Sequence, residues 1–230
     1  MGKRGWGNKF YNIIGKRIFD MALSALALLV FSPIFIPIMM IIILDSPGSP
    51  FFIQKRIGKG MNHFYLIKFR SMRSSEGASK GQFDPGDESR VTKIGKILRQ
   101  TKVDELPQLF NVFKGDMSIV GTRPEIDKYV IIYFEDFESI LLNRPGLSDF
   151  ASIKYHDEDI ILSCQENADD YYLKIILPDK LKLSKAYSEN ICLKTDLYII
   201  KETINIIVKS IRHFFRKYNF KAMFNEFNRR

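Results

Sequence analysis

The longest apolar stretch of the chain covers residues 18–44, where polar side chains are rare. It exceeds the roughly 20 residues that a helix needs to cross a bilayer. Ser32 and Pro33 lie in its middle, and Pro37 follows one turn later. Proline removes a backbone donor and clashes with the preceding turn, so we expect a bend there, with the Ser32 hydroxyl bonded to freed backbone groups.

Basic residues flank this stretch on both sides: Lys16 and Arg17 precede it, and Lys55, Arg56 and Lys59 follow it. Because basic flanks favour the cytoplasm, the pattern predicts a re-entrant helix that enters the membrane, bends and leaves on the same side. A kinked helix that spans the membrane stays open as the alternative. A signal peptide does not fit, since the stretch is too long and no small-residue cleavage site follows.

A short β-hairpin is predicted after the apolar stretch. Residues 51–54 lead into a turn at 55–60, and the second strand covers residues 64–72, where apolar and polar side chains alternate. Lys68 and Arg70 are two positions apart and would share one face of that strand.

Most of the remaining chain is predicted to be helical. The hydrophobic spacing predicts helices over residues 92–99, 125–142, 171–183 and 193–207. The first is basic with an apolar stripe of Ile94, Ile97 and Leu98, so we expect it at the membrane surface. The polar residues 73–90 predict a loop, and the acidic residues 157–166 are expected to be exposed.

The C-terminal residues 209–230 carry seven basic residues and one acidic residue. Phe220, Phe224 and Phe227 fall on one helical face of this tail. A basic and aromatic helix suits either a nucleic acid or a membrane surface, and the apolar stretch near the N-terminus favours the membrane.

Composition narrows the partners without choosing one. The chain has 230 residues and a net charge of +9, which suits a nucleic acid, an anionic membrane surface or a phosphorylated substrate. Cys164 and Cys192 are far apart and follow no metal-binding spacing, so we expect neither a disulfide framework nor a zinc site, and a reducing cytosolic environment is the default.

Charged side chains gather in residues 98–124, with Asp104 and Glu105 adjacent at the centre. Four basic residues flank the pair: Arg99, Lys102, Lys114 and Arg123. Metal-assisted phosphoryl chemistry needs such a group, because carboxylates bind Mg²⁺ and guanidinium groups bind phosphate oxygens. A structural role is the alternative, in which Asp104 caps a helix and Glu105 lies in its first turn.

The order of residues 103–124, VDELPQLFNVFKGDMSIVGTRP, favours the chemical role. This string resembles, nearly letter for letter, the signature of the bacterial sugar transferases, the small monotopic phosphoglycosyl transferases. The resemblance extends from about Lys16 to Asp196 and Leu197. A run of this length is far more specific than a short glycine or carboxylate motif.

The resemblance implies transfer of a sugar 1-phosphate from a UDP-sugar to a polyprenyl phosphate, with release of UMP. Undecaprenyl phosphate is the expected bacterial acceptor, and the product starts assembly of a glycan. Asp104 is implied as the nucleophile that forms a covalent phosphosugar intermediate, and Asp104 and Glu105 as the ligands of Mg²⁺. Ser32 and Pro33 are implied as the membrane break. The implied substrate- or phosphate-binding residues are Lys68, Arg70, Arg99, Arg123, Pro124 and Asp196.

Together, pattern and resemblance predict an α+β fold that is mainly helical. We expect a basic N-terminus with the re-entrant helix over residues 1–50, a cytosolic catalytic domain with amphipathic surface helices and a short β-hairpin over 51–208, and a tail over 209–230. Residues 148–152 read SDFAS where the family often has TGWAQ, so we expect this departure to bear on the sugar. The expected location is the cytoplasmic face of the bacterial inner membrane.

Two other functions remain from the residues alone. A membrane-surface nucleic-acid-binding protein is favoured only by charge, and a non-catalytic scaffold is disfavoured by the intact pair of carboxylates. We expect UDP-sugar, polyprenyl phosphate and membrane lipids as partners and no nucleic acid. A homodimer stays open.

Overall fold

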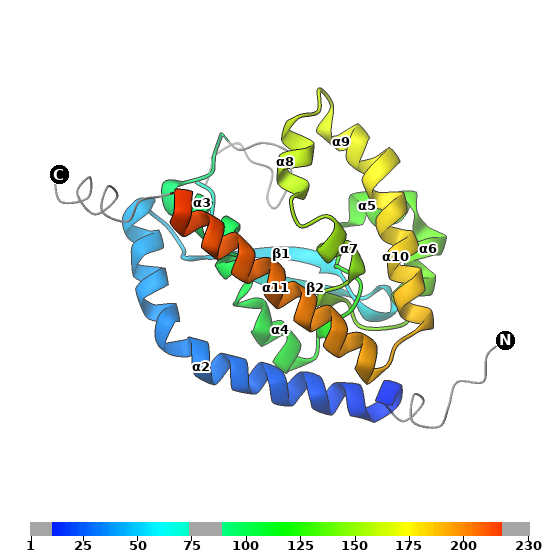
Figure 1. Ribbon diagram of the computed structural model, residues 1–230. Helices are drawn as coiled ribbons and strands as arrows, with labels where there is room; N and C mark the ends of the chain where they lie inside the picture. Colours follow the sequence, from blue (N-terminus) through cyan, green and yellow to red (C-terminus); the bar gives the residue numbers. More distant parts are fainter. Residues whose placement is uncertain (1–10, 74–88, 218–230) are drawn as a thin grey trace.

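The computed structural model describes residues 11–73 and 89–217, whose arrangement Figure 1 shows. The described part is mainly helical with a two-stranded antiparallel hairpin, so the predicted fold class is confirmed at that level. Phe220, Phe224 and Phe227 of the predicted tail lie outside the described residues, as does most of the predicted loop over 73–90.

Helix α2 (Lys16–Asp45) contains the predicted apolar stretch. Among the described helices it is the one long and apolar enough to cross a membrane, and an 18-residue stretch within it has a mean hydropathy of 2.8. Figure 1 shows that α2 bends part-way along, and Pro33 and Pro37 both lie inside it. The helix continues through the bend, since Ser32 Oγ donates to the carbonyl oxygen of Leu29, one turn back, at 3.1 Å.

Both ends of α2 are fixed to the rest of the protein. Near its start, Arg17 donates to two carbonyl oxygens at the end of α4 (Gln108–Lys114), at 2.7 and 2.8 Å. Just beyond its end, the buried guanidinium of Arg70 donates to the carbonyl oxygen of Pro47 at 2.7 Å. Between these two attachments, α2 runs along the outside of the domain (Figure 1).

The hairpin consists of β1 (Phe51–Ile57) and β2 (His63–Phe69), paired over their full length. Its turn lies at Lys59–Met61 instead of the predicted 55–60. The first strand is longer than expected because Arg56 remains in it, with its guanidinium paired to Glu125 at 3.3 Å inside the domain. An ion pair between residues far apart in the sequence cannot be predicted from the local pattern of apolar and polar residues.

Helix α3 (Lys93–Gln100) is amphipathic, as predicted, and starts at Thr92, whose Oγ1 accepts from the backbone N–H of Gly95 at 2.9 Å. Its apolar stripe faces the interior of the protein, where Leu98 packs in one cluster with Phe35 and Ile42 of α2. A 3₁₀ turn and α4 follow it, and α4 lies between α2 and the hairpin (Figure 1).

A second small sheet, which the sequence did not predict, pairs β3 (Ser118–Val120) in parallel with β4 (Gly146–Ser148). The two backbone segments approach so closely that a Cβ on Gly146 would lie 2.0 Å from the backbone nitrogen of Gly121. Only glycine permits this contact. Strands of three residues show no readable alternation, so the sequence pattern does not predict them.

The single helix predicted over residues 125–142 is wrong. The structure has α5 (Asp127–Ile132) and α6 (Phe134–Ile140), separated at Tyr133, whose φ and ψ are −116° and 43°. β-Branched and aromatic side chains surround the break and lose rotamer freedom in a helix. Tyr133 instead donates its hydroxyl to the carbonyl oxygen of Leu173 at 3.0 Å.

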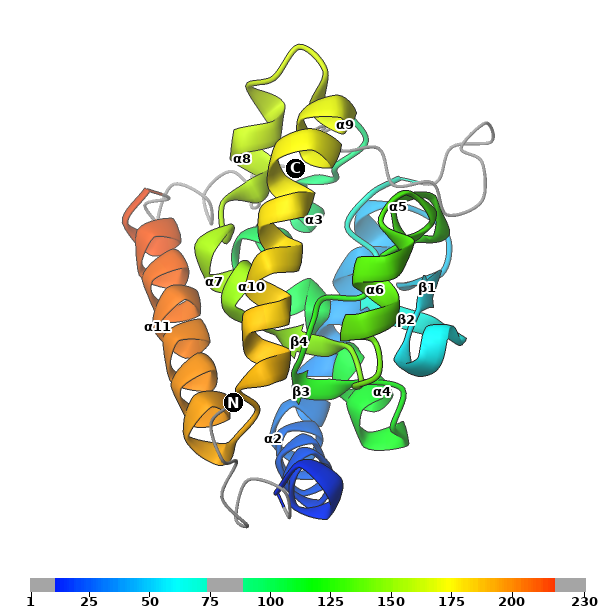
Figure 2. The same cartoon turned by 90° about the vertical axis from the view of Figure 1, so that its right-hand side faces the viewer.

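The C-terminal half is helical. The helix predicted over residues 171–183 corresponds to a π-helical turn and the first part of a helix that ends at Glu189, and the helix predicted over 193–207 extends to Lys217. Figure 2 shows the last two helices side by side, with β3 and β4 between them and α5, α6 and the hairpin. The final helix passes residue 208, where the tail was expected to begin. These elements are α7 (Phe150–Lys154), α8 (Glu158–Ser163), α9 (Ala168–Tyr171), a π-helical turn (Tyr172–Ile176), α10 (Leu177–Glu189) and α11 (Leu193–Lys217).

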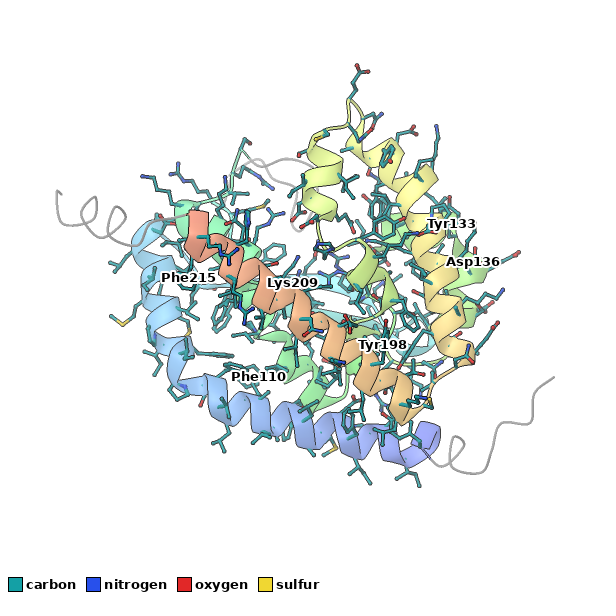
Figure 3. All side chains as sticks on the ribbon, viewed as in Figure 1. Phe110, Tyr133, Asp136, Tyr198, Lys209 and Phe215 are labelled. Carbon is teal, nitrogen blue, oxygen red and sulfur yellow. The ribbon has the colours of Figure 1, made fainter. Side chains whose placement is uncertain are left out.

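The core lies between these layers in three clusters. Tyr129 and Tyr172 pack at the centre of the first, between α5, α6 and α10, with ring centroids 4.9 Å apart. Val112 and Tyr187 belong to the second, which joins α4 and β3 to α10 and α11. The third includes Phe35 in the second half of α2, whose ring meets that of Phe110 edge-on. Figure 3 labels Phe110 on α4.

Candidate active site

Asp104 and Glu105 lie in a tight 3₁₀ turn, Val103–Glu105, between α3 and α4. Lys102 introduces the turn with φ 57° and ψ 16°, a left-handed conformation that residues with a Cβ rarely adopt. Neither carboxylate caps α4, whose flanking residue is Pro107. The helix-capping alternative is therefore wrong, and backbone strain beside a carboxylate pair is typical of functional sites.

Glu105 is engaged by two cations. Its Oε1 accepts from Lys68 Nζ at 3.1 Å and from Arg123 Nη2 at 2.5 Å, and its Oε2 lies 3.4 Å from Arg123 Nη1. Burial alone would raise the pKa of Glu105, but Arg123 and Lys68 hold it well below its usual range. Glu105 is therefore ionised at neutral pH and fixed in place.

Asp104 is buried, and its Oδ1 has no hydrogen-bond partner among the described residues. Burial and the neighbouring charge of Glu105 raise the pKa of Asp104 to about 6, although Lys68, Lys102 and Arg99 oppose the shift. At neutral pH this carboxylate is thus ionised, unpaired at Oδ1 and more basic than an ordinary aspartate. That is the state a carboxylate nucleophile requires.

Arg123 reaches Glu105 from the chain that leaves β3. The close contact at Gly121 fixes this chain on one side. On the other side, Arg56 Nη1 donates to the carbonyl oxygen of Pro124 at 3.1 Å. Pro124 therefore contributes through its backbone, by holding the turn from which Arg123 extends.

Arg99 lies at the end of α3 and pairs with Asp159 of α8, with 2.8 Å between Nη2 and Oδ2. Burial opposes ionisation of Asp159, but Arg99, Lys102 and Lys68 lower its pKa below the usual range. The side chain of Asp159 is 48% exposed, as expected for residues 157–166, but it also belongs to the charge cluster around Asp104. Lys102 forms no ion pair with any described residue, so its charge is available to a ligand.

Comparison with known proteins matches residues 11–210 to the family described as bacterial sugar transferase. The chain belongs to this family. The resemblance inferred from residues 103–124 is confirmed, and so is the prediction of a transferase.

Several curated transferases are relatives of this sugar transferase. It is 35% identical over 196 residues to the UDP-N-acetylgalactosamine-undecaprenyl-phosphate N-acetylgalactosaminephosphotransferase of Aeromonas hydrophila, covering 84% of this chain and 43% of that protein. It is 39% identical over 143 residues to the UDP-glucose:undecaprenyl-phosphate glucose-1-phosphate transferase of Caulobacter vibrioides, covering 60% and 53%. It is 31% identical over 212 residues to the exopolysaccharide production protein ExoY of Sinorhizobium fredii, covering 86% and 87%. The chain thus spans about half the length of the first two relatives and most of the third.

Lys68 and Arg70 of the transferase, expected together on one face, are separated in the structure. β2 ends at Phe69, so the alternation of side chains stops between these two residues, and they point to different parts of the protein. Lys68 reaches Glu105, and burial lowers the pKa of its ammonium group although Glu105 opposes the shift. Arg70 holds the carbonyl oxygens after α2, and the structure does not bring it to the carboxylate pair.

Asp196 of the transferase is fully buried at the start of α11. Its carboxylate accepts from Tyr11 Oη at 2.6 Å, Lys16 Nζ at 2.6 Å and Tyr187 Oη at 2.7 Å. The structure therefore places this residue, expected near phosphate, in a joint between the start of α2, α10 and α11.

The departure at residues 148–152 borders the site. Asp149 accepts from the backbone N–H of Ser152 at 2.7 Å and so caps α7. It also lines a small cavity, shared with Thr122, Arg123 and Lys180, that has room for about one water molecule. Arg123, the cation that holds Glu105, lines the same cavity.

Gln108 is a residue that the sequence analysis missed. It opens α4 one turn after Asp104, is 1% exposed, and its Nε2 has no hydrogen-bond partner among the described residues. A buried donor without a partner is costly, so a bound group is expected to satisfy it. The spacing of four residues from Asp104 was the available signal. Asp159 gave no such signal, because it is distant in the chain.

The described residues contain no group of three histidine, cysteine, aspartate or glutamate side chains that would form a protein-only metal site. Mg²⁺ in phosphoryl-transfer enzymes typically takes one or two carboxylates and completes its shell with water and substrate phosphates. The unpaired, buried Oδ1 of Asp104 fits such a site. Glu105 fits as a second ligand that shares its oxygens with Lys68 and Arg123.

Proposed function

We propose that this protein transfers a sugar 1-phosphate from a UDP-sugar to undecaprenyl phosphate and releases UMP. Family membership supports a sugar transferase, and the names of two relatives specify an undecaprenyl-phosphate acceptor and a UDP-sugar donor. Those names differ in the sugar, so the sugar of this chain stays open.

The observation that carries the proposal is the state of Asp104. It is the buried carboxylate that remains unpaired at Oδ1 while its neighbour is paired with Lys68 and Arg123. A structural aspartate at this degree of burial would be hydrogen-bonded. An ionised, unpaired one surrounded by cations is suited to attack a phosphorus atom whose own negative charges those cations offset.

In the first step, an oxygen of Asp104 attacks the phosphorus that bears the sugar, and the bond from this phosphorus to the bridging oxygen breaks. UMP leaves with the electron pair, and an acyl phosphate on Asp104 carries the sugar. Arg99 and Lys102 lie on the α3 side of Asp104 and offset the charge of the diphosphate as it binds. Dividing the transfer in two lets a single carboxylate serve both substrates.

In the second step, a phosphate oxygen of undecaprenyl phosphate attacks the same phosphorus. The bond to Asp104 breaks, the diphosphate-linked sugar forms on the lipid, and the carboxylate is regenerated. Mg²⁺, when bound at Asp104 and Glu105, would supply positive charge that offsets the repulsion between carboxylate and diphosphate. Atoms and charges balance without a further reactant.

We also propose that α2 enters the cytoplasmic membrane of a bacterium and returns to the same side. Its start is tied to α4 by Arg17 and to α11 by Lys16, and its end is tied to the hairpin side by Arg70. Two ends attached to one folded domain cannot lie on opposite faces of a bilayer. The apolar side chains along α2 are largely exposed, so lipid is their natural environment.

The test is the half-reaction without acceptor. Purified protein with Mg²⁺ and a panel of UDP-sugars should release at most one UMP per active site, and its mass should increase by one sugar phosphate. Asp104→Asn should abolish both signals, because an amide of nearly the same shape is a poor nucleophile. Asp127→Asn, at an exposed aspartate paired with His63, is the matched control and should react normally. Normal turnover by Asp104→Asn would remove Asp104 as the nucleophile.

A further inference from the structure

Helix α8 places two carboxylates over the site. Glu158 pairs with Lys180 at 2.5 Å, and Asp159 pairs with Arg99 at 2.8 Å. Arg99 lies in the last turn of α3, so the second pair joins α8 to α3. A helix distant in sequence from the central motif thus supplies anions to its cations.

The pair between Arg99 and Asp159 occupies a group that a diphosphate needs. Arg99 can bind a phosphate through two parallel N–H donors, and a carboxylate on its Nη2 takes one of them. Asp159 also lies within the field of Lys102 and Lys68, which together with Arg99 lower its pKa. Its carboxylate therefore stands among the cations that would receive a substrate phosphate.

The contact is built to be displaced. The side chain of Asp159 is 48% exposed and that of Arg99 is 24% exposed. Ion pairs with this much water around them are weak, so a diphosphate, which carries two negative charges and can form two hydrogen bonds to Arg99, can replace the carboxylate. Glu158 and Lys180 are less exposed, at 20% and 8%, and their ion pair attaches α8 to α10 independently of Asp159.

We propose that Asp159 occupies the place of a donor phosphate on Arg99 and is displaced when the diphosphate binds, so that it sets the affinity of the site for its donor. This inference rests on the proposed function. Asp159 weakens donor binding by competition, and it returns to Arg99 as UMP leaves. A site with four cations in reach of one substrate is thereby kept from holding its product too tightly.

The experiment compares Asp159→Asn with wild type and with Asp157→Asn. Asp157 lies two residues earlier, is exposed and pairs with His156, so its substitution is the matched control. The full-length proteins in detergent are titrated calorimetrically with inorganic pyrophosphate and with UDP at constant free Mg²⁺. Asp159→Asn should bind both about fivefold more tightly, with a smaller gain at high salt, and Asp157→Asn should match wild type. Asp159→Glu, which retains the anion, should stay close to wild type.

Unchanged or weaker pyrophosphate binding by Asp159→Asn would overturn the inference, because the carboxylate would then position Arg99 instead of competing for it. Absence of measurable pyrophosphate binding by both proteins would count against it as well. The two proposals fail separately. Pyrophosphate contains no uridine, so a gain in its affinity together with no UMP release from any UDP-sugar would reject the proposed donor and keep the role of Asp159. A normal UMP burst without a gain in pyrophosphate affinity would reject the role of Asp159 and keep the proposed donor.

Discussion

Asp104 and Glu105 are neighbours in the chain, yet their carboxylates are held in opposite electrostatic states. Glu105 accepts hydrogen bonds from Lys68 and Arg123, which hold its pKa well below the usual range. Oδ1 of Asp104 has no partner among the described residues, and burial together with Glu105 raises its pKa to about 6. The pair thus divides into one fixed anion and one free to react.

This division predicts opposite effects on stability. Because folded Asp104 binds its proton more tightly than the unfolded chain, its contribution to stability falls as pH rises from about 4 to 6. At pH 7.5, Asp104→Asn should therefore raise the free energy of unfolding, by about 1–3 kcal/mol. Glu105→Gln leaves two cations without their anion and should lower it by about 1–3 kcal/mol. Urea unfolding checks both, with Asp127→Asn as the exposed control; a destabilised Asp104→Asn would contradict the account.

The rate of the first step should follow the ionisation of Asp104. Only the carboxylate attacks phosphorus, so the UMP burst should slow about tenfold per pH unit below pH 6 and level off above it. Single-turnover measurements without lipid acceptor are the appropriate ones, since the acceptor phosphate also titrates near pH 6. A profile that is level down to pH 4.5 would show that Asp104 has an ordinary pKa.

The two ends of α2 should lie on the same side of the membrane. In a protein whose Cys164 and Cys192 are replaced by serine, Ile14→Cys and Lys55→Cys introduce thiols at exposed positions near the two ends. An impermeant maleimide should label both from the cytoplasmic side and neither from the other. Pro33→Ala removes one cause of the bend and should increase the fraction that spans. Labelling of the two thiols from opposite sides of the membrane would reject the re-entrant arrangement.

The joint at Asp196 should matter for stability more than for chemistry. Asp196→Asn leaves the ammonium group of Lys16, 14% exposed, without its anion and should cost about 2–4 kcal/mol. In a Lys16→Met background the same substitution should cost much less, because no unpaired charge remains. Asp179→Asn, at an exposed ion pair with Lys154, is the control. Equal costs of Asp196→Asn in the two backgrounds would show that Lys16 and Asp196 are not coupled.

Gln108 should exchange stability for activity. Replacing its unpartnered buried amide by a side chain of similar length, in Gln108→Met, should raise the free energy of unfolding by about 1–2 kcal/mol. The UMP burst should slow, because the donor one turn after Asp104 no longer reaches bound substrate. Thermal unfolding and burst kinetics of the same preparation test both effects. A destabilised variant with a normal burst would indicate that the amide is held by a buried water.

The sequence by itself determined the elements whose cause is local. The apolar run with Ser32, Pro33 and Pro37 specified a long bent helix, and alternation specified the hairpin. The order of residues 103–124 indicated the family and the carboxylate pair, because the residues that identify the family follow one another directly in the chain. The helix over 125–142 failed because the break at Tyr133 depends on a contact with Leu173, beyond any local window.

Only the tertiary structure decided which charges meet. It brought Lys68 to Glu105 and sent Arg70 to the end of α2. It also moved Asp159 from an apparently solvated acidic stretch onto Arg99. Side-chain type and periodicity are local properties that survive in the order of residues. The pairing of charged side chains that are far apart in sequence depends on how helices and strands pack around a shared core, which only the tertiary structure shows.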